Sequence, residues 1–177
     1  MSNTPKGIFI LFLLLFTLAQ TASASTLEEV RKRGSLRCGV NGSVPGLSLQ
    51  ESGGTWSGLD ADICRAVAAA ALGDARKVTF VPLSNQERLD ALKQDRVDVL
   101  ARNTTWTLGR DTQMGINFVG VSYHDGQGLM VPKAKGVHSV LELNGISVCV
   151  LSETTSIDNI KRFFTLNRMG VKLAPFD

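Results

Sequence analysis

The sequence predicts an α/β fold, an open parallel sheet covered by helices. Strand-like and helix-like stretches alternate along the first half of the chain, with short connections. The predicted strands are residues 35–40, 77–81 and 97–100, and helices are predicted at 58–72 and from Ser84 onward. Ligands of such sheets bind beyond the carboxyl ends of the strands. The loops that leave those ends are therefore expected to line one crevice.

A short helix is predicted at the start of the folded chain. Thr26 and Glu29 have the spacing of a capping box, with Thr26 as the N-cap, and Gly34 is expected to end the helix. Residues 41–58 are rich in Gly, Ser, Asn and Pro, which indicates a loop with a small hairpin whose second arm holds Trp56.

The strongest helical pattern covers residues 58–72. Asp60 is expected to cap this helix, Asp62 lies in its first turn, and Gly73 ends it. A carboxylate pair with a catalytic role is the weaker reading of the two aspartates. The apolar face at helical spacing comprises Ile63, Val67, Ala70 and Ala71.

A second capping box, residues 84–87, opens the next helix, with Leu89 and Leu92 facing inward. Further along, residues 117–121 are predicted to form a strand, and Ser139 to open a short helix. The pattern of strand, hydroxyl-rich loop, helix and strand then repeats, at residues 146–151, 152–156, 157–164 and from 172 onward.

This repetition places a boundary near Gly126, with lobe one at residues 25–126 and a partial lobe two at residues 127–177. Lobe one is expected to be nearly complete. Lobe two has at most two clear strands and one good helix, which is too little to bury a stable core alone. The sequence therefore suggests a fragment or a truncated product.

Residues 1–24 are predicted to be a secretory signal peptide. Lys6 precedes an apolar run, residues 8–18, and Ala22-Ser23-Ala24 gives a small-x-small cleavage pattern. The mature chain is expected to begin at Ser25 and to be soluble and periplasmic. Cleavage removes one Lys and no acid, so the net charge of +3 falls to +2. The sequence has no basic block that would suggest nucleic acid.

The chain has three cysteines, Cys38, Cys64 and Cys149, and two histidines. No CxxC pair is present, so no structural zinc site and no cofactor are expected. All three cysteines lie in apolar stretches, which favours buried free thiols. A Cys38–Cys64 bridge stays open as the alternative, because an exported chain meets an oxidising compartment.

Two hydroxyl-rich loops have the chemistry of an anion site. Residues 100–111 combine three Thr, one Asn and two Arg around one Trp, and a guanidinium matches a carboxylate through two hydrogen bonds. The alternative is a solvated surface loop. Residues 152–156 precede a helix whose free amides favour an anion. Here the alternative is that Thr155 or Ser156 is only an N-cap.

Catalytic patterns are weak. The sequence has no G-x-S-x-G elbow, no P-loop and no complete G-x-G-x-x-G after a strand. His124 beside Asp125 has no obvious nucleophile to serve. A binding protein is therefore favoured over an enzyme.

Three segments carry a family resemblance: G-L-D-A-D-I at residues 58–63, R-N-T-T-W-T-L-G-R-D at 102–111, and Y-H-D-G-Q-G-L-M-V at 123–131. They resemble the family 3 extracellular solute-binding proteins, the periplasmic receptors of amino-acid ABC transporters, and in particular the general L-amino-acid subgroup. The resemblance covers essentially the whole mature chain and implies a two-lobed periplasmic binding protein-like fold of type II that closes by a hinge.

The resemblance also implies site residues. Arg110 matches the Arg that binds the ligand carboxylate, Asn103 and Thr105 fall at ligand-contacting positions, and Thr155 matches the Thr of lobe two that completes the carboxylate site. Arg102 stands where relatives of narrower specificity carry a small hydroxyl residue, and it is included as a candidate.

The implied function is to bind L-amino acids in the periplasm and deliver them to the membrane permease of an ABC transporter. The chain is expected to act as a monomer with no nucleic-acid partner. Asn85 stands where some relatives place an aromatic ring over the ligand side chain, which suggests broader specificity. The alternatives are a dehydratase-type enzyme on the same scaffold, and a fragment without function. The family's acidic residue for the ligand ammonium would lie beyond Asp177, so a truncated chain is expected to bind weakly or not at all.

Overall fold

The computed structural model describes residues 25–177, and the predicted signal peptide lies outside them. A three-stranded sheet organises the first part of the chain. It contains β1 (Leu36–Val40), β5 (Val78–Pro82) and β6 (Val99–Leu100) in the order β5-β1-β6. All pairs are parallel, so the carboxyl ends of the strands meet at one edge. The predicted parallel α/β sheet is confirmed.

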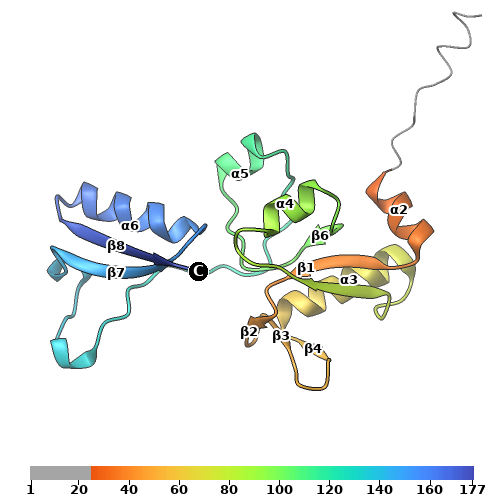
Figure 1. The fold of residues 1–177 in the computed structure, drawn as a ribbon, viewed down its shortest axis with the longest axis horizontal. Helices are drawn as coiled ribbons and strands as arrows, with labels where there is room; N and C mark the ends of the chain where they lie inside the picture. The colour runs from red at the N-terminus through yellow and green to blue at the C-terminus, as the bar shows by residue number, and fades with distance from the viewer. Residues whose placement is uncertain (1–24) are drawn as a thin grey trace, which may run out of the picture.

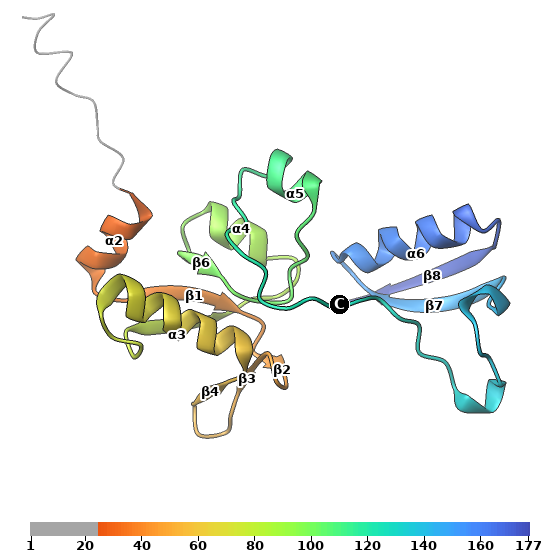
Figure 2. The ribbon, with the colours of Figure 1, turned by 180° about the vertical axis from the view of Figure 1, so that it is seen from behind.

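Two helices cover opposite faces of this sheet. The chain crosses from β1 to β5 through α3 (Leu59–Leu72) and returns from β5 to β6 through α4 (Arg88–Lys93). Right-handed crossovers in opposite directions put their helices on opposite faces. Figures 1 and 2 show α3 and α4 on the two sides of β1.

The first helix, α2 (Thr26–Arg33), has the predicted capping box shifted by one residue. Ser25 is the N-cap, and its hydroxyl accepts from the amide of Glu28, whose carboxylate accepts from the amide of Ser25. The prediction of Thr26 as N-cap is therefore wrong. Gly34 ends the helix in a left-handed conformation, as expected.

The loop after β1 contains a small antiparallel sheet of β2 (Ser43–Val44), β3 (Ser48–Gln50) and β4 (Trp56–Ser57). The turn between β2 and β3 caps α3 with its backbone. The amide of Leu59 donates to Gly46 and that of Asp60 to Leu47, at 3.0 and 2.8 Å. The amides at the helix start are thus satisfied by carbonyls, so Asp60 is not the cap that we predicted.

The buried face of α3 differs from the predicted one. Asp60, Ala61, Cys64 and Ala68 are buried, whereas Ala70 is exposed. Cys64 forms a disulfide with Cys38 of β1, with a Cα–Cα distance of 5.9 Å. This bond joins α3 to the strand and fixes which face turns inward. The expectation of free, buried cysteines is therefore wrong, and Cys149 is free but exposed.

After β6 the chain forms α5 (Leu108–Gln113), a short helix that the sequence did not predict. Thr107 is its N-cap and accepts from the amide of Arg110 at 3.2 Å. The strand predicted at residues 117–121 is absent from the structure of residues 25–177, and Val119 is 91 % exposed. Its alternating apolar residues find no neighbouring strand there to pair with.

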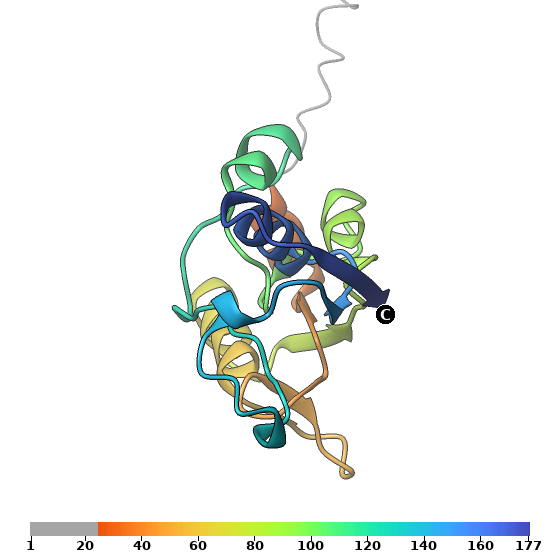
Figure 3. The same ribbon diagram turned by 90° about the vertical axis from the view of Figure 1, so that its left-hand side faces the viewer.

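A second, two-stranded sheet follows, in which β7 (Ile146–Leu151) and β8 (Val171–Phe176) are parallel and joined by α6 (Thr155–Leu166). The short helices η1 (Lys133–Lys135) and η2 (Val140–Glu142) precede it, the latter capped by Ser139 as expected. Figure 3 looks along the molecule with this sheet and α6 nearest the viewer.

Each of the two parallel sheets has its own hydrophobic core. Leu143, Val150, Ile160 and Phe164 form one cluster around β7, β8 and α6, and three smaller clusters surround the sheet of β5, β1 and β6. We propose that residues 25–126 and 127–177 act as two lobes, called lobe one and lobe two below. Within residues 25–177, no helix is both long enough and apolar enough to cross a bilayer.

Candidate functional site

The candidate site lies at the edge where β1, β5 and β6 end. Val40 pairs with Pro82, and Gly39 with Leu100, so the loops that follow all three strands emerge side by side. These loops supply Asn41, Asn85, and the predicted candidates at residues 102–110. The turn after β7 approaches the same edge from lobe two, and Figure 1 shows the C-terminus between the two sheets.

Three of the predicted site residues are brought together. The hydroxyls of Thr105 and Thr155 are 3.1 Å apart, one from each lobe. Nη1 of Arg110 donates to the carbonyl of Thr105 at 2.9 Å. Thr155 is the first residue of α6, and the N-cap before it, Thr154, forms no side-chain cap bond. A guanidinium, two hydroxyls and a helix N-terminus thus meet at one place, which is a favourable arrangement for an anion.

Arg102, a predicted ligand-binding residue, is buried and bonds to other loops of lobe one. It is 6 % exposed, and its Nη1 donates to the carbonyls of Leu83 and Ser84. Its Nη2 donates to the side-chain oxygens of Asn85 and Asn103, at 2.7 and 3.1 Å. The guanidinium therefore joins the loops after β5 and β6.

Asn103 is exposed at the tip of this arrangement. Its Oδ1 accepts from Arg102 and also, at 3.4 Å, from Nδ2 of Asn41. Asn103 is thus connected to Arg102 and to the loop after β1, and not directly to the group formed by Thr105, Arg110 and Thr155.

Sequence reasoning missed Arg88, the first residue of α4. It is 2 % exposed and donates to the carbonyl of Asn85 and, across to lobe two, to the carbonyl of Glu153, both at 2.7 Å. Glu153 adopts a left-handed backbone with φ of 54°. Arg88 and Ala91 are the fully buried residues of α4, whereas we expected Leu89 and Leu92 on its inner face. Leu92 does pack, partly buried, against the cluster that contains Ala91. The hydrogen bonds of the predicted capping box do form between Ser84 and Glu87, but they enclose a turn that precedes α4 and do not cap its first residue.

The site holds three guanidinium groups, and the carboxyl groups of Asp60, Glu153 and Asp158 lie near enough to act on their pKa values. Burial and, after it, the charges of Arg102 and Arg110 together lower the pKa of Arg88 to about 10. Burial also lowers the pKa values of Arg102 and Arg110. Arg88 is thus disfavoured as a cation by two neighbouring guanidinium groups, and an anion bound among them would relieve that effect.

Asp60 is the buried carboxyl at this edge. It is 2 % exposed, its Oδ2 has no hydrogen-bond partner among residues 25–177, and burial raises its pKa while the charge of Arg102 opposes that rise. Within the same residues, no cluster of His, Cys, Asp or Glu is suited to hold a metal ion.

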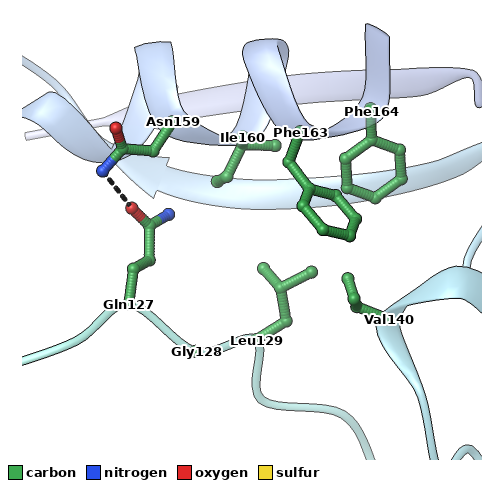
Figure 4. A pocket seen from close by; sticks show the side chains of 8 residues that line it. All are labelled: Gln127, Gly128, Leu129, Val140, Asn159, Ile160, Phe163 and Phe164. Atoms are coloured by element: carbon green, nitrogen blue, oxygen red, sulfur yellow. Dashed lines mark hydrogen bonds between the residues drawn. The ribbon is translucent and has the colours of Figure 1, made fainter. Parts of the chain in front are cut away.

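A separate cavity of about 340 Å³ lies within lobe two, between the connecting segment and α6. Figure 4 shows Leu129, Ile160 and Phe163 facing into it, with a hydrogen bond of 2.9 Å from Asn159 to Gln127 at one end. Its walls carry no charged side chain, so it does not suit the carboxylate that the Arg110 loop is arranged to bind.

The fold, a parallel sheet with an anion-binding edge faced by a second α/β unit, defines the class of periplasmic binding proteins. The chain superposes with a TM-score of 0.82 on an ABC transporter periplasmic binding protein from Brucella ovis with glutathione bound, at 46% identity. That match covers 86% of this chain and 48% of the other. Residues 36–168 match the bacterial extracellular solute-binding proteins, family 3, and the chain belongs to this family.

Two curated relatives are close in sequence. The general L-amino acid-binding periplasmic protein AapJ of Rhizobium johnstonii is 46% identical over 159 residues, covering 90% of this chain and 47% of AapJ. The glutamate/glutamine/aspartate/asparagine-binding protein BztA of Rhodobacter capsulatus is 48% identical over 152 residues, 86% of this chain and 45% of BztA.

The chain spans about half the length of these relatives. Both are named as binding proteins, so the chain is a homologue of amino-acid-binding proteins. This result confirms the family resemblance and the preference for binding over catalysis.

Proposed function

We propose that this chain binds an L-amino acid between its two lobes, as part of the substrate-binding component of an ABC transporter. One observation carries the proposal: Thr105 of lobe one and Thr155 of lobe two meet at 3.1 Å, with Arg110 bonded to Thr105. In this proposal the ligand carboxylate accepts hydrogen bonds from the guanidinium of Arg110, both hydroxyls and the first amides of α6. Asn103 and Arg102 line the same edge.

Transport requires further steps that we also propose. Residues 1–24 direct export to the periplasm, and the Cys38–Cys64 disulfide suits that oxidising compartment. Closure of the two lobes around the ligand then creates the form that the membrane permease recognises. The names of AapJ and BztA, a general L-amino acid binder and a binder of acidic amino acids and their amides, support this class of ligand.

Thermal unfolding of residues 25–177 with a panel of L-amino acids tests the proposal. We expect bound amino acids to raise the midpoint of unfolding. Arg110→Ala is expected to weaken binding by roughly 10- to 100-fold, because charge-assisted hydrogen bonds to the carboxylate contribute about 1.5–3 kcal/mol. Arg76→Ala, which removes an exposed Arg paired with Asp74, is the matched control and should leave binding unchanged.

The carboxylate itself is tested with a ligand pair, L-glutamine and 4-aminobutanamide, which is glutamine without its carboxylate. Stabilisation by glutamine alone, lost in Arg110→Ala, supports the assignment. Stabilisation by both compounds, or by neither, contradicts it.

A further inference from the structure

We propose that Arg102 is a positioning residue that turns the carboxamides of Asn85 and Asn103 so that both offer N–H donors to the ligand. The site would then select amino acids whose side chains end in an acceptor oxygen, a carboxylate or a carboxamide. This inference rests on the proposed function, because it describes the side-chain end of the same ligand.

The orientation of the two carboxamides follows from the chemistry of Arg102. A guanidinium donates hydrogen bonds and accepts none. Its Nη2 lies 2.7 Å from Oδ1 of Asn85 and 3.1 Å from Oδ1 of Asn103. Neither amide can be flipped without placing an NH2 group against a donor, so each NH2 group is directed away from Arg102.

A second, independent contact fixes the same orientation for Asn103. The backbone amide of Ser43, which can only donate, lies 3.2 Å from Oδ1 of Asn41. Nδ2 of Asn41 is thereby turned toward Asn103 and donates to its Oδ1 at 3.4 Å. Asn103 thus accepts from two donors on one side, and its own NH2 group faces the other side.

The two NH2 groups are available to a ligand. Asn103 is exposed and Asn85 is half-buried, and neither NH2 group has a hydrogen-bond partner within residues 25–177. Both residues lie in loops that follow parallel strands, at the edge where α/β sheets bind ligands. Arg102 is held in place by the carbonyls of Leu83 and Ser84.

The ligand class follows from this inventory of donors. Two carboxamide NH2 groups and the nearby guanidinium groups complement an oxygen acceptor. A side chain ending in an ammonium group would meet the NH2 donors of both carboxamides, and its own donors would stay unpaired. We therefore expect L-glutamate to bind more tightly than L-norleucine, and L-norleucine more tightly than L-lysine.

Asn85→Asp tests the inference with a nearly isosteric change. The carboxylate keeps an oxygen for Arg102 but removes the NH2 donor and adds negative charge. In titration calorimetry we expect the affinity for L-glutamate to fall about tenfold or more, while that for L-norleucine changes little and that for L-lysine rises. An equal loss for all three ligands, or no loss for L-glutamate, would overturn the inference.

A measurement on the free protein separates this inference from the proposed function. Asn85→Asp and Asn103→Asp should each raise the midpoint of thermal unfolding, because a carboxylate oxygen beside Arg102 forms a charge-assisted bond. Asn117→Asp, the same change at an exposed position, should not. If no amino acid binds the unmodified chain, the proposed function fails, and a fall in the midpoint for Asn85→Asp still refutes the orientation of the amides.

Discussion

At the scale of single residues, the site contains ionisable groups whose charged forms are disfavoured by burial. Asp60 and Arg102 are both more than nine-tenths buried, and each shifts the pKa of the other toward the charged form while burial acts in the opposite direction. Charged groups at such positions are expected where a protein binds ions. Their titration therefore reports on the site without any ligand.

We predict that Asp60 gives the protein a distinct pH dependence. Its pKa is raised above the ordinary value of 3.8, so the folded state binds the proton more tightly than the unfolded state does. The contribution of Asp60 to stability therefore falls as the pH rises from about 4 through its raised pKa. In urea unfolding at several pH values, Asp60→Asn should flatten this decline. Parallel curves for the variant and the unmodified protein would contradict the assignment.

The structure brings Arg110, Thr105 and Thr155 together, and their role in binding stays a prediction. Arg102 donates to the loops after β5 and β6, and Arg88 was not predicted at all. Both differences have one cause. From the sequence alone, an arginine side chain is predicted to be exposed to solvent. Only the fold shows that carbonyls from distant loops accept hydrogen bonds from its donors and allow it to be buried.

At the scale of elements, the sequence predicted helices and strands correctly where the structure of a segment depends on its own residues. The strand at residues 146–151 and the stop signals at Gly34 and Gly73 are as predicted. The predicted cap of α3, Asp60, was wrong because the groups that cap this helix lie in another segment of the chain. Carbonyls of the loop before β3 satisfy the first amides, and an ideal Cβ at Gly58 would overlap the carbonyl oxygen of Leu47.

The disulfide between β1 and α3 should contribute strongly to stability. Cys38 and Cys64 are fully buried and 26 residues apart in sequence. A cross-link over a loop of this length restricts the unfolded chain and stabilises the fold by about 3–4 kcal/mol. The double variant Cys38→Ala, Cys64→Ala should lose about that amount in urea unfolding. Cys149→Ala, at an exposed thiol, should change stability little, and equal effects of the two changes would refute this prediction.

At the scale of the whole molecule, the chain has two parallel sheets with separate cores, joined by an extended segment. Few polar contacts bridge them: Arg88 with Glu153, Thr105 with Thr155, and Gln86 with Asp177 at 2.6 Å. Such sparse bonding is compatible with motion of one lobe relative to the other, which the proposed closure requires.

We predict that limited proteolysis cuts this connection first. Tyr123 is 65 % exposed in a segment without helix or strand, and exposed irregular segments are the preferred sites of nicking. Brief digestion with chymotrypsin should cleave after Tyr123 and leave a stable product from lobe one, and Tyr123→Ser should delay that cut. Initial cleavage within β7 or α6 would show that lobe two opens before the connection is reached.

The backbone conformation of Glu153 affects the free-energy difference between the open and closed forms of the proposed closure. A left-handed conformation costs a residue other than glycine roughly 1–2 kcal/mol, and here it accompanies the bond from its carbonyl to Arg88. Separation of the lobes would break that hydrogen bond and let the backbone of Glu153 relax. The lost hydrogen-bond energy would then be partly offset by the released backbone strain. The arrangement with the lobes together and the arrangement with the lobes apart are therefore expected to differ little in free energy. A ligand of modest affinity is sufficient to decide between them.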